Sequence, residues 1–246
     1  MSNTLDYTFF GDAVKAFTTR RMLGRDRNGL CQMLCIDDSH LIIPHQTHQD
    51  VVRVIDKALI ALPEQQKKDI LEGVDAVVTN VPQTCIGVST ADCIPVLLYD
   101  PEHSAVGAAH AGWRGTVKRI VQKTISVMQT TYGSRPEALK AVIGPGISIG
   151  NFEVGDEVYE AFADAGFLMD AIAKRYPTKQ DPQKEKWHLD IVECNKFQLV
   201  ESGLPPGNIH VEAICTFDNT DQFFSARKEQ KGIVKCGRNF NAIMIK

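Results

Sequence analysis

Short apolar runs rich in β-branched residues, set off by Gly and Pro, alternate along this chain with longer amphipathic segments. Runs of about four to eight apolar residues are typical of buried strands, whereas apolar residues about three and four positions apart are typical of helices. The alternation of the two patterns predicts a mixed α/β fold. Because 246 residues with 43% hydrophobic content suffice for one sizeable core, we expect a single domain over residues 1–246.

The two patterns assign much of the chain to strands and helices. The predicted strands are Leu41–Ile43, Val51–Ile55, Asp75–Thr79, Cys85–Ser89, Ile94–Tyr99, Ala105–Ala109, Ala141–Ile143, Ile209–Thr216 and Phe240–Ile245. The predicted helices are Glu64–Leu71, Thr116–Tyr132, Asp156–Ala165 and Leu189–Ser202. Residues Tyr176–Lys186, dense in Pro, Lys, Gln and Asp, are predicted to form an exposed loop.

Charge and cysteine usage exclude several classes of partner. The 27 basic and 30 acidic residues give a formal charge of -3, and no block of Lys and Arg predicts nucleic-acid binding. No apolar run approaches the ~20 residues that cross a bilayer, and the first residues lack the pattern of a secretion signal. The seven cysteines have no close-set spacing, which argues against a disulfide framework. We therefore expect a cytoplasmic protein with no membrane partner.

Three segments place possible metal ligands at the ends of predicted strands. They are residues 44–48 (PHQTH), 89–95 (STADCIP) and 110–116 (HAGWRGT). Strands that end at one edge of a sheet bring distant residues together, so His48, Cys93 and His110 are candidates to bind one ion. One Cys and two His give zinc about three ligands and leave a fourth position for a water, which the ion activates.

Each candidate ligand also has a plain structural interpretation. A histidine in an apolar segment is more often a core residue than a ligand, and cysteine is frequently buried without any chemistry. His45 is a rival ligand to His48. Asp92 either orients a ligand histidine or caps a turn.

The glycine-rich segment after His110 is a candidate anion site. Gly112 to Thr116 lies between a predicted strand and a long predicted helix, where free backbone N–H groups and the helix dipole favour an oxyanion. Arg114 adds a positive charge there. The alternatives are a tight turn that needs Gly112 and Gly115, and an arginine that forms a surface ion pair.

These segments resemble those of a family described as laccase-domain proteins, multicopper polyphenol oxidases and zinc-dependent purine nucleoside phosphorylases. The resemblance covers most of the chain in order. It rests on Gln46-Thr47-His48, Asp75–Thr79, Thr90–Leu98, His110–Thr116, Ile143–Pro145, Phe152–Gly155 and Phe224–Arg227.

The resemblance implies mixed sheets flanked by helices, in an α/β/β/α type of layering. It also implies a metal bound by His48, Cys93 and His110, with Zn²⁺ expected and Cu²⁺ possible. The implied activity is phosphorolysis of adenosine, inosine, guanosine and methylthioadenosine, together with adenosine deamination. The expected catalytic residues are Cys93, His110 and Asp92, and the expected substrate contacts are Arg114, Arg20, Gln46, Asp75 and Arg227.

The chain departs from the family pattern at several positions. Thr19-Arg20 matches the start of an N-terminal motif, but the usual glycine-rich continuation is absent. Gly146 and Gly150 stand where relatives often carry Cys, and Phe152 stands where Tyr is usual. These departures bear on the substrate contacts more than on the metal.

The two reactions need different groups. For deamination, we hypothesise that Asp92 or Asp75 shuttles the proton. For phosphorolysis, we hypothesise that phosphate is held by Arg114 or Arg20, by the turn at residues 112–115, or by the open position on the metal.

Three alternatives to this function stay open. Cys93 and His110 also suit a cysteine hydrolase, such as an amidase acting on cell-wall peptide precursors, for which His48 is superfluous. A polyphenol oxidase is the second alternative, but four-copper chemistry is discounted, because it needs many histidines, often as His-x-His pairs, and this chain has seven histidines and no such pair. A non-catalytic module that binds a nucleoside or a metal is the third alternative. The oligomeric state is left open.

Overall fold

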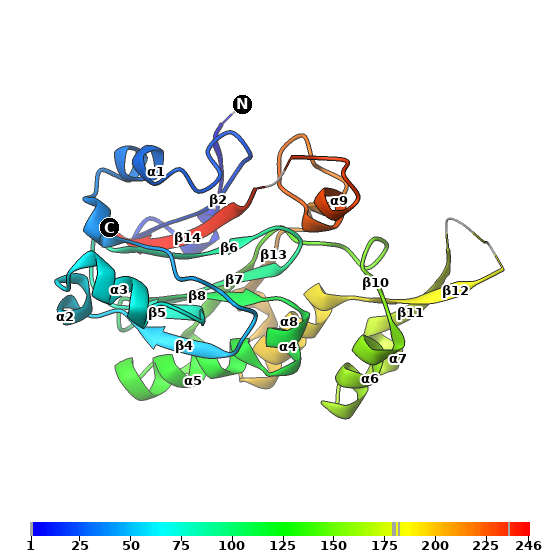
Figure 1. The fold of residues 1–246 in the computed structure, drawn as a ribbon. Coiled ribbons are helices and arrows are strands. Elements are labelled where there is room, and N and C mark those ends of the chain that lie inside the picture. Colours follow the sequence, from blue (N-terminus) through cyan, green and yellow to red (C-terminus); the bar gives the residue numbers. More distant parts are fainter. Residues whose placement is uncertain (1, 179–180, 182, 236) are drawn as a thin grey trace.

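The computed structural model describes residues 2–178, 181, 183–235 and 237–246, and within them the strands form three sheets (Figure 1). The five-stranded sheet runs β1 (Thr4–Asp6), β2 (Val14–Thr19), β14 (Asn239–Ile245), β6 (Cys85–Thr90), β3 (Leu41–Ile42). The six-stranded sheet runs β13 (Ile209–Val211), β9 (Lys140–Ile143), β7 (Ile94–Asp100), β8 (Ala105–Ala111), β5 (Val74–Thr79), β4 (Val51–Val54). The three-stranded sheet runs β10 (Glu153–Val154), β12 (Glu185–Leu189), β11 (Ala173–Pro177).

The two large sheets pack face to face and enclose the main hydrophobic core. Ile86 and Ile243 of the five-stranded sheet are buried in the same cluster as Val77, Leu97 and Val142 of the six-stranded sheet. Strands β5, β7 and β8 are buried at every residue. Their near-continuous apolar sequences follow from this burial on both faces, since a half-exposed strand would alternate with polar residues.

Helices cover the outer faces of both large sheets (Figure 1). Helices α5 and α8 pack on the six-stranded sheet, α1 packs on the five-stranded sheet, and α6 and α7 pack on the three-stranded sheet. This arrangement confirms the predicted α/β/β/α layering. The α-helices are α1 (Arg27–Leu34), α2 (Lys57–Ile60), α3 (Glu64–Ile70), α4 (Trp113–Val117), α5 (Ile120–Tyr132), α6 (Asp156–Asp164), α7 (Met169–Ile172), α8 (Ile191–Glu201) and α9 (Ala226–Gln230). None of the helices in the described ranges has both the length and the apolar content to span a membrane.

The helix predicted over Thr116–Tyr132 is broken in the structure. It begins earlier, as α4, and the chain then turns at Arg119, whose φ of 63° lies in the left-handed region, before α5 starts. The Arg119 guanidinium donates to the carbonyl of Ala165 at 2.8 Å and lies over the Phe167 ring. These tertiary contacts hold a conformation that helical periodicity alone does not predict.

The predicted elements differ from the structure in three other places. The strand predicted over Ile209–Thr216 ends at Val211, and Thr216 instead donates its N–H to the carbonyl of Gly146. Of the predicted loop Tyr176–Lys186, residues 179, 180 and 182 lie outside the described residues, and both of its ends belong to strands β11 and β12. Strands β1, β2 and β10 and helices α1, α2, α7 and α9 were not predicted. The other predicted elements have counterparts whose ends agree within about two residues.

Candidate metal centre

The three predicted metal ligands meet where the chain crosses between the two large sheets. His48 lies on the connection from β3 to β4, and Cys93 lies on the connection from β6 to β7. His110 lies near the end of β8, opposite Pro95 in the antiparallel β7–β8 pair. Their ligand atoms all lie within 4.8 Å of one another, and the two imidazole rings are 5.0 Å apart. This separation is compatible with one ion, because Zn–N and Zn–S bonds are ~2.0–2.3 Å long.

Asp75 of β5 fixes both histidines. Its carboxylate is fully buried and accepts a hydrogen bond from His110 Nδ1 at 2.7 Å. It also accepts from the backbone N–H groups of Thr47, His48 and Gln49 at 2.8–3.2 Å. The first bond leaves Nε2 of His110 as the free ring nitrogen, and the other three hold His48 at a φ of 61°. Asp75 is thus a positioning residue beneath the centre.

The electrostatics of the centre favour a thiolate on Cys93. Burial alone would raise the pKa of this thiol, but the charge of His110 and hydrogen bonds from both histidines lower it to about 6. Burial would lower the pKa of His110, but the charge of Cys93 and the hydrogen bond to Asp75 raise it to about 9. Burial alone would raise the pKa of Asp75, but hydrogen bonds from His110 and from the loop backbone outweigh the effect of burial and lower this pKa. Because a thiolate is the form that binds metal, Cys93 is prepared as a ligand.

Gly112 gives the three side chains room to converge. A Cβ at this position would lie 3.0 Å from Cys93 Sγ and 3.2 Å from His48 Cδ2. The backbone φ of −68° is one that any residue adopts, so the glycine is needed here for space. The sequence predicts a turn or an anion site at Gly112, and the structure adds its close approach to the candidate ligands Cys93 and His48.

A cavity of about 500 Å³ opens onto the three side chains. Gln46 lines it and braces its wall, because its amide donates to the carbonyl of Ser89 at 2.9 Å and accepts from the N–H of Ser89 at 2.7 Å. A volume of this size lies within the ~300–1,000 Å³ range of small-molecule sites. Its lining comprises Arg25, Pro44, His45, Gln46, His48, Ser89, Ala91, Cys93, His110, Ala226, Gly237 and Arg238.

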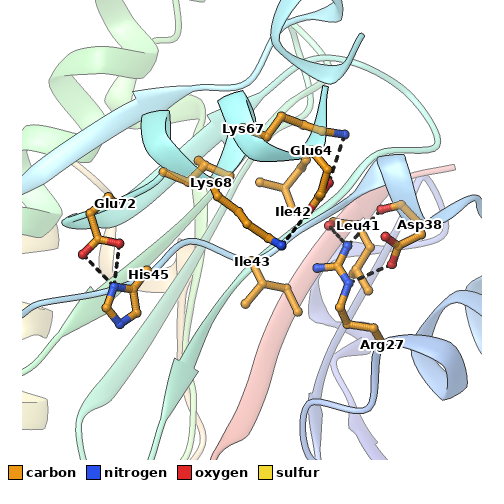
Figure 2. A pocket seen from close by; sticks show the side chains of 11 residues that line it. Arg27, Asp38, Leu41, Ile42, Ile43, His45, Glu64, Lys67, Lys68 and Glu72 are labelled. Carbon is orange, nitrogen blue, oxygen red and sulfur yellow. Dashed lines mark hydrogen bonds and ion pairs between the residues drawn. The ribbon is translucent and has the colours of Figure 1, made fainter. Parts of the chain in front are cut away.

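His45, the rival ligand, faces a different partner. Its Nδ1 lies 2.8 Å from a carboxylate oxygen of Glu72, as Figure 2 shows, and both side chains are mostly exposed. They border a separate cavity of about 300 Å³ between α1 and α3, where Arg27 pairs with Asp38. The structure therefore groups His48 with Cys93 and His110, and places the His45 ring nitrogen on Glu72.

Arg114 and Arg20, the two arginines predicted to hold phosphate, lie outside this cavity. Arg114 is exposed and stacks its guanidinium 4.3 Å from the Trp113 ring centroid. Arg20 donates to the side chain of Gln222 and lies over the ring of Phe223. Neither residue lines the cavity that opens onto the three candidate ligands.

Asp92 and Arg227 join the C-terminal segment to the turn that carries Cys93. The Asp92 carboxylate accepts hydrogen bonds from the hydroxyls of Thr216 and Ser225 and from the N–H of Arg227, at 2.7–3.0 Å. The Arg227 guanidinium donates to the carbonyl of Glu153 at 3.0 Å and 3.1 Å. Both side chains are committed to partners that hold the walls of the site in place.

Arg25 and Arg238 line the cavity, although the sequence analysis did not single them out. Arg25 stands in a segment with several other arginines, and Arg238 lies more than two hundred positions further along the chain. No motif or spacing relates the two residues. The pairing of β2 with β14 brings their segments together.

The fold and the site define an α/β/β/α protein with a Cys/His/His centre that is able to hold a metal. The chain belongs to the family described as multi-copper polyphenol oxidoreductase laccase, whose model matches residues 15–246. A relative from Bacteroides thetaiotaomicron, named purine nucleoside phosphorylase, is 44% identical over 205 residues, which cover 83% of this chain and 73% of the relative. A relative from an unknown prokaryotic organism, named adenosine deaminase RL5, is 39% identical over 87% of this chain and 78% of its own.

Solved structures share the fold. The hypothetical protein YfiH of Bacillus licheniformis superimposes with a TM-score of 0.82 at 26% identity, covering 95% of this chain and 93% of its own. YlmD of Geobacillus stearothermophilus superimposes with a TM-score of 0.84 at 23% identity, covering 100% of this chain and 97% of its own. The fold predicted from the sequence is therefore the fold of this family, and the chain is related to enzymes.

The donor set fits one metal ion and does not fit a multi-copper cluster. A laccase-type cluster needs a blue-copper site plus further sites rich in histidine. In the described ranges, the five other histidines are dispersed over partners away from the centre: His40 on Thr84, His45 on Glu72, His103 on Asp100, His188 on the carbonyl of Ile149, and His210 on Glu212. The family description names copper oxidation, but these residues do not supply the ligands for it.

Proposed function

We propose that this protein is a metal-dependent purine nucleoside phosphorylase that acts on adenosine, inosine, guanosine and methylthioadenosine and also deaminates adenosine. The observation that carries the proposal is the convergence of Cys93, His48 and His110 on the lining of a cavity large enough for a nucleoside. The names of the relatives support both reactions.

The donor chemistry supports zinc as the ion, with copper as a competitor for the same ligands. A thiolate and two neutral imidazoles give three ligands and leave a fourth position open, which is the pattern of catalytic zinc sites. A zinc ion bound there would act as a Lewis acid and lower the pKa of a water from ~15.7 toward ~7. Because the Cys93 thiolate must stay reduced, we also propose that the protein works in the cytoplasm.

The chain's own residues orient the centre. Asp75 holds the tautomer of His110 that presents Nε2, and it anchors the loop that carries His48. Asp92 acts in this proposal as a positioning residue, because its oxygens fasten Thr216 and the start of α9 to the Cys93 turn. Gln46 joins the segment before His48 to β6 through its two hydrogen bonds with Ser89.

Turnover of adenosine with and without phosphate, before and after chelation, tests the proposal. We expect ribose 1-phosphate only with phosphate, inosine in both cases, and loss of both products after chelation or in Cys93→Ala. His210→Ala is the matched control, since His210 contacts Glu212 and does not line the cavity, and we expect it to retain both activities. Ribose 1-phosphate formation by Cys93→Ala at the wild-type rate would rule out this site. Full metal occupancy without turnover of any nucleoside would favour a non-catalytic module.

A cysteine hydrolase is the second candidate, because Cys93, His110 and Asp75 also form the arrangement of a catalytic triad. The low pKa of Cys93 and the raised pKa of His110 suit a thiolate nucleophile paired with an imidazolium. His48 discriminates between the two candidates. Loss of metal and of phosphorolysis in His48→Ala supports the phosphorylase, whereas an acyl-enzyme trapped on Cys93 in that variant supports an amidase.

A further inference from the structure

Arg25 and Arg238 give the cavity at the candidate centre an excess of positive charge. No Asp or Glu is among the described residues that line this cavity. In the cavity of Figure 2, by contrast, Arg27 is paired with Asp38, Lys67 and Lys68 lie near Glu64, and His45 contacts Glu72. Within the described residues, Arg238 pairs with Glu229, which does not line the cavity, and Arg25 has no ion-pair partner, so the lining of this cavity keeps a net positive charge.

The backbone on either side of the two arginines is fixed by buried polar contacts. Thr19 donates its hydroxyl to the carbonyl of Gly24 at 2.7 Å and accepts the N–H of Phe240 at 2.7 Å. Gly24 has a φ of 51°, and a Cβ there would lie 3.4 Å from the carbonyl oxygen of Arg238. Residues 24–25 and 238–240, from opposite ends of the chain, are thus joined as one wall of the cavity.

Arg25 and Arg238 are two like charges on the lining of the same cavity. Burial and, after it, the charge of Arg238 lower the pKa of Arg25. Arg238 has one acidic partner, Glu229, at 3.1 Å, and its side chain remains 38% exposed. Like charges held together in this way are stabilised by an anion placed between them, and guanidinium groups bind the oxygens of phosphate in pairs.

We propose that Arg25 and Arg238 form the subsite that binds inorganic phosphate next to the metal centre. This inference rests on the proposed function, because phosphorolysis requires a phosphate dianion held beside the nucleoside. It transfers the role predicted for Arg20 and Arg114 to residues that line the cavity. The subsite holds phosphate at the wall formed by residues 24–25 and 238–240, with the three candidate ligands lining the same cavity.

Binding of inorganic phosphate to the metal-loaded protein, measured by titration calorimetry, tests the subsite. We expect Arg25→Ala to raise the Kd for phosphate at least about tenfold and Arg25→Lys to raise it less, because lysine keeps the charge but loses the paired contacts. The control is Arg27→Ala, which removes a nearby arginine that is paired with Asp38 in the other cavity. We expect its Kd to equal that of the wild type.

Two results would overturn the subsite. One is a Kd for phosphate in Arg25→Ala within about twofold of the wild type. The other is tighter binding of AMP than of adenosine, abolished by Arg25→Ala while phosphate binding is unchanged, since this would assign the arginines to a nucleotide. The proposed function has a separate test: if the wild type forms no ribose 1-phosphate, it fails whatever the calorimetry shows.

Discussion

At the scale of single residues, the geometry of the candidate centre depends on Asp75 as much as on His48, Cys93 and His110. The sequence analysis placed Asp75 among the substrate contacts or proton shuttles, because an acidic residue at the start of a strand gives no sign of where its carboxylate points. In the structure the carboxylate is buried and accepts four N–H groups, three of them from the loop that carries His48. Such a contact depends on tertiary packing between β5 and a distant loop, which no local pattern encodes.

Replacing Asp75 with Asn should loosen the centre. An amide presents N–H groups to backbone N–H donors, so at least one donor loses its acceptor, and the tautomer of His110 is no longer fixed. We expect metal affinity, measured by competition with a zinc chelator, to fall by about 10–100-fold. The control is Glu72→Gln, which removes the partner of His45 and should leave the affinity unchanged. An Asp75→Asn protein with wild-type affinity would contradict the positioning role.

The pH dependence of Cys93 alkylation tests the electrostatics of the centre. In metal-free protein the lowered pKa keeps Cys93 as a thiolate as the pH falls, so the iodoacetamide rate should halve at a pH of about 6. For a thiol with an unperturbed pKa, the alkylation rate would halve at a pH near ~8.5. Burial raises the pKa of Cys85 and Cys194, and both should stay unmodified in the native protein. Peptide mass spectrometry measures each site, and a midpoint for Cys93 near that of an ordinary thiol would contradict the account.

At the scale of elements, the connections between sheets carry the site. The loop from β3 to β4 and the turn from β6 to β7 each pass from one large sheet to the other, and each delivers one candidate ligand. The apolar runs predicted these strands, and the polar residues at their ends predicted ligands there. The break between α4 and α5 was not predictable, because contacts of Arg119 with Ala165 and Phe167 override the helical period.

A substitution at Gly112, the residue before α4, tests how closely the backbone there approaches the candidate ligands Cys93 and His48. Gly112→Ala should keep the fold, since the backbone conformation suits alanine, but its Cβ meets Cys93 and His48. We expect metal affinity to fall at least about tenfold with little change in the free energy of unfolding. Gly150→Ala is the control, because a Cβ there has no neighbour within 4 Å. Equal metal affinities of the two variants would show that the ligands do not converge beside Gly112.

At the scale of the whole molecule, the layered fold was predictable and the composition of the cavity was not. Buried strands and amphipathic helices follow from hydrophobic periodicity, and the resemblance gave their layering. The wall with Arg25 and Arg238 joins two ends of the chain through β2 and β14, a pairing that rests on long-range register between the two strands. A single sequence carries no signal for such a pairing, so only the structure shows that Arg25 and Arg238 line the same cavity.

Anomalous scattering from a crystal, recorded at the zinc and copper absorption edges, tests whether Cys93, His48 and His110 bind one metal ion. We expect one peak per chain, bounded by Cys93 Sγ and by ring nitrogens of His48 and His110, with the signal at the zinc edge. Several peaks per chain, or one peak away from these three side chains, would contradict it.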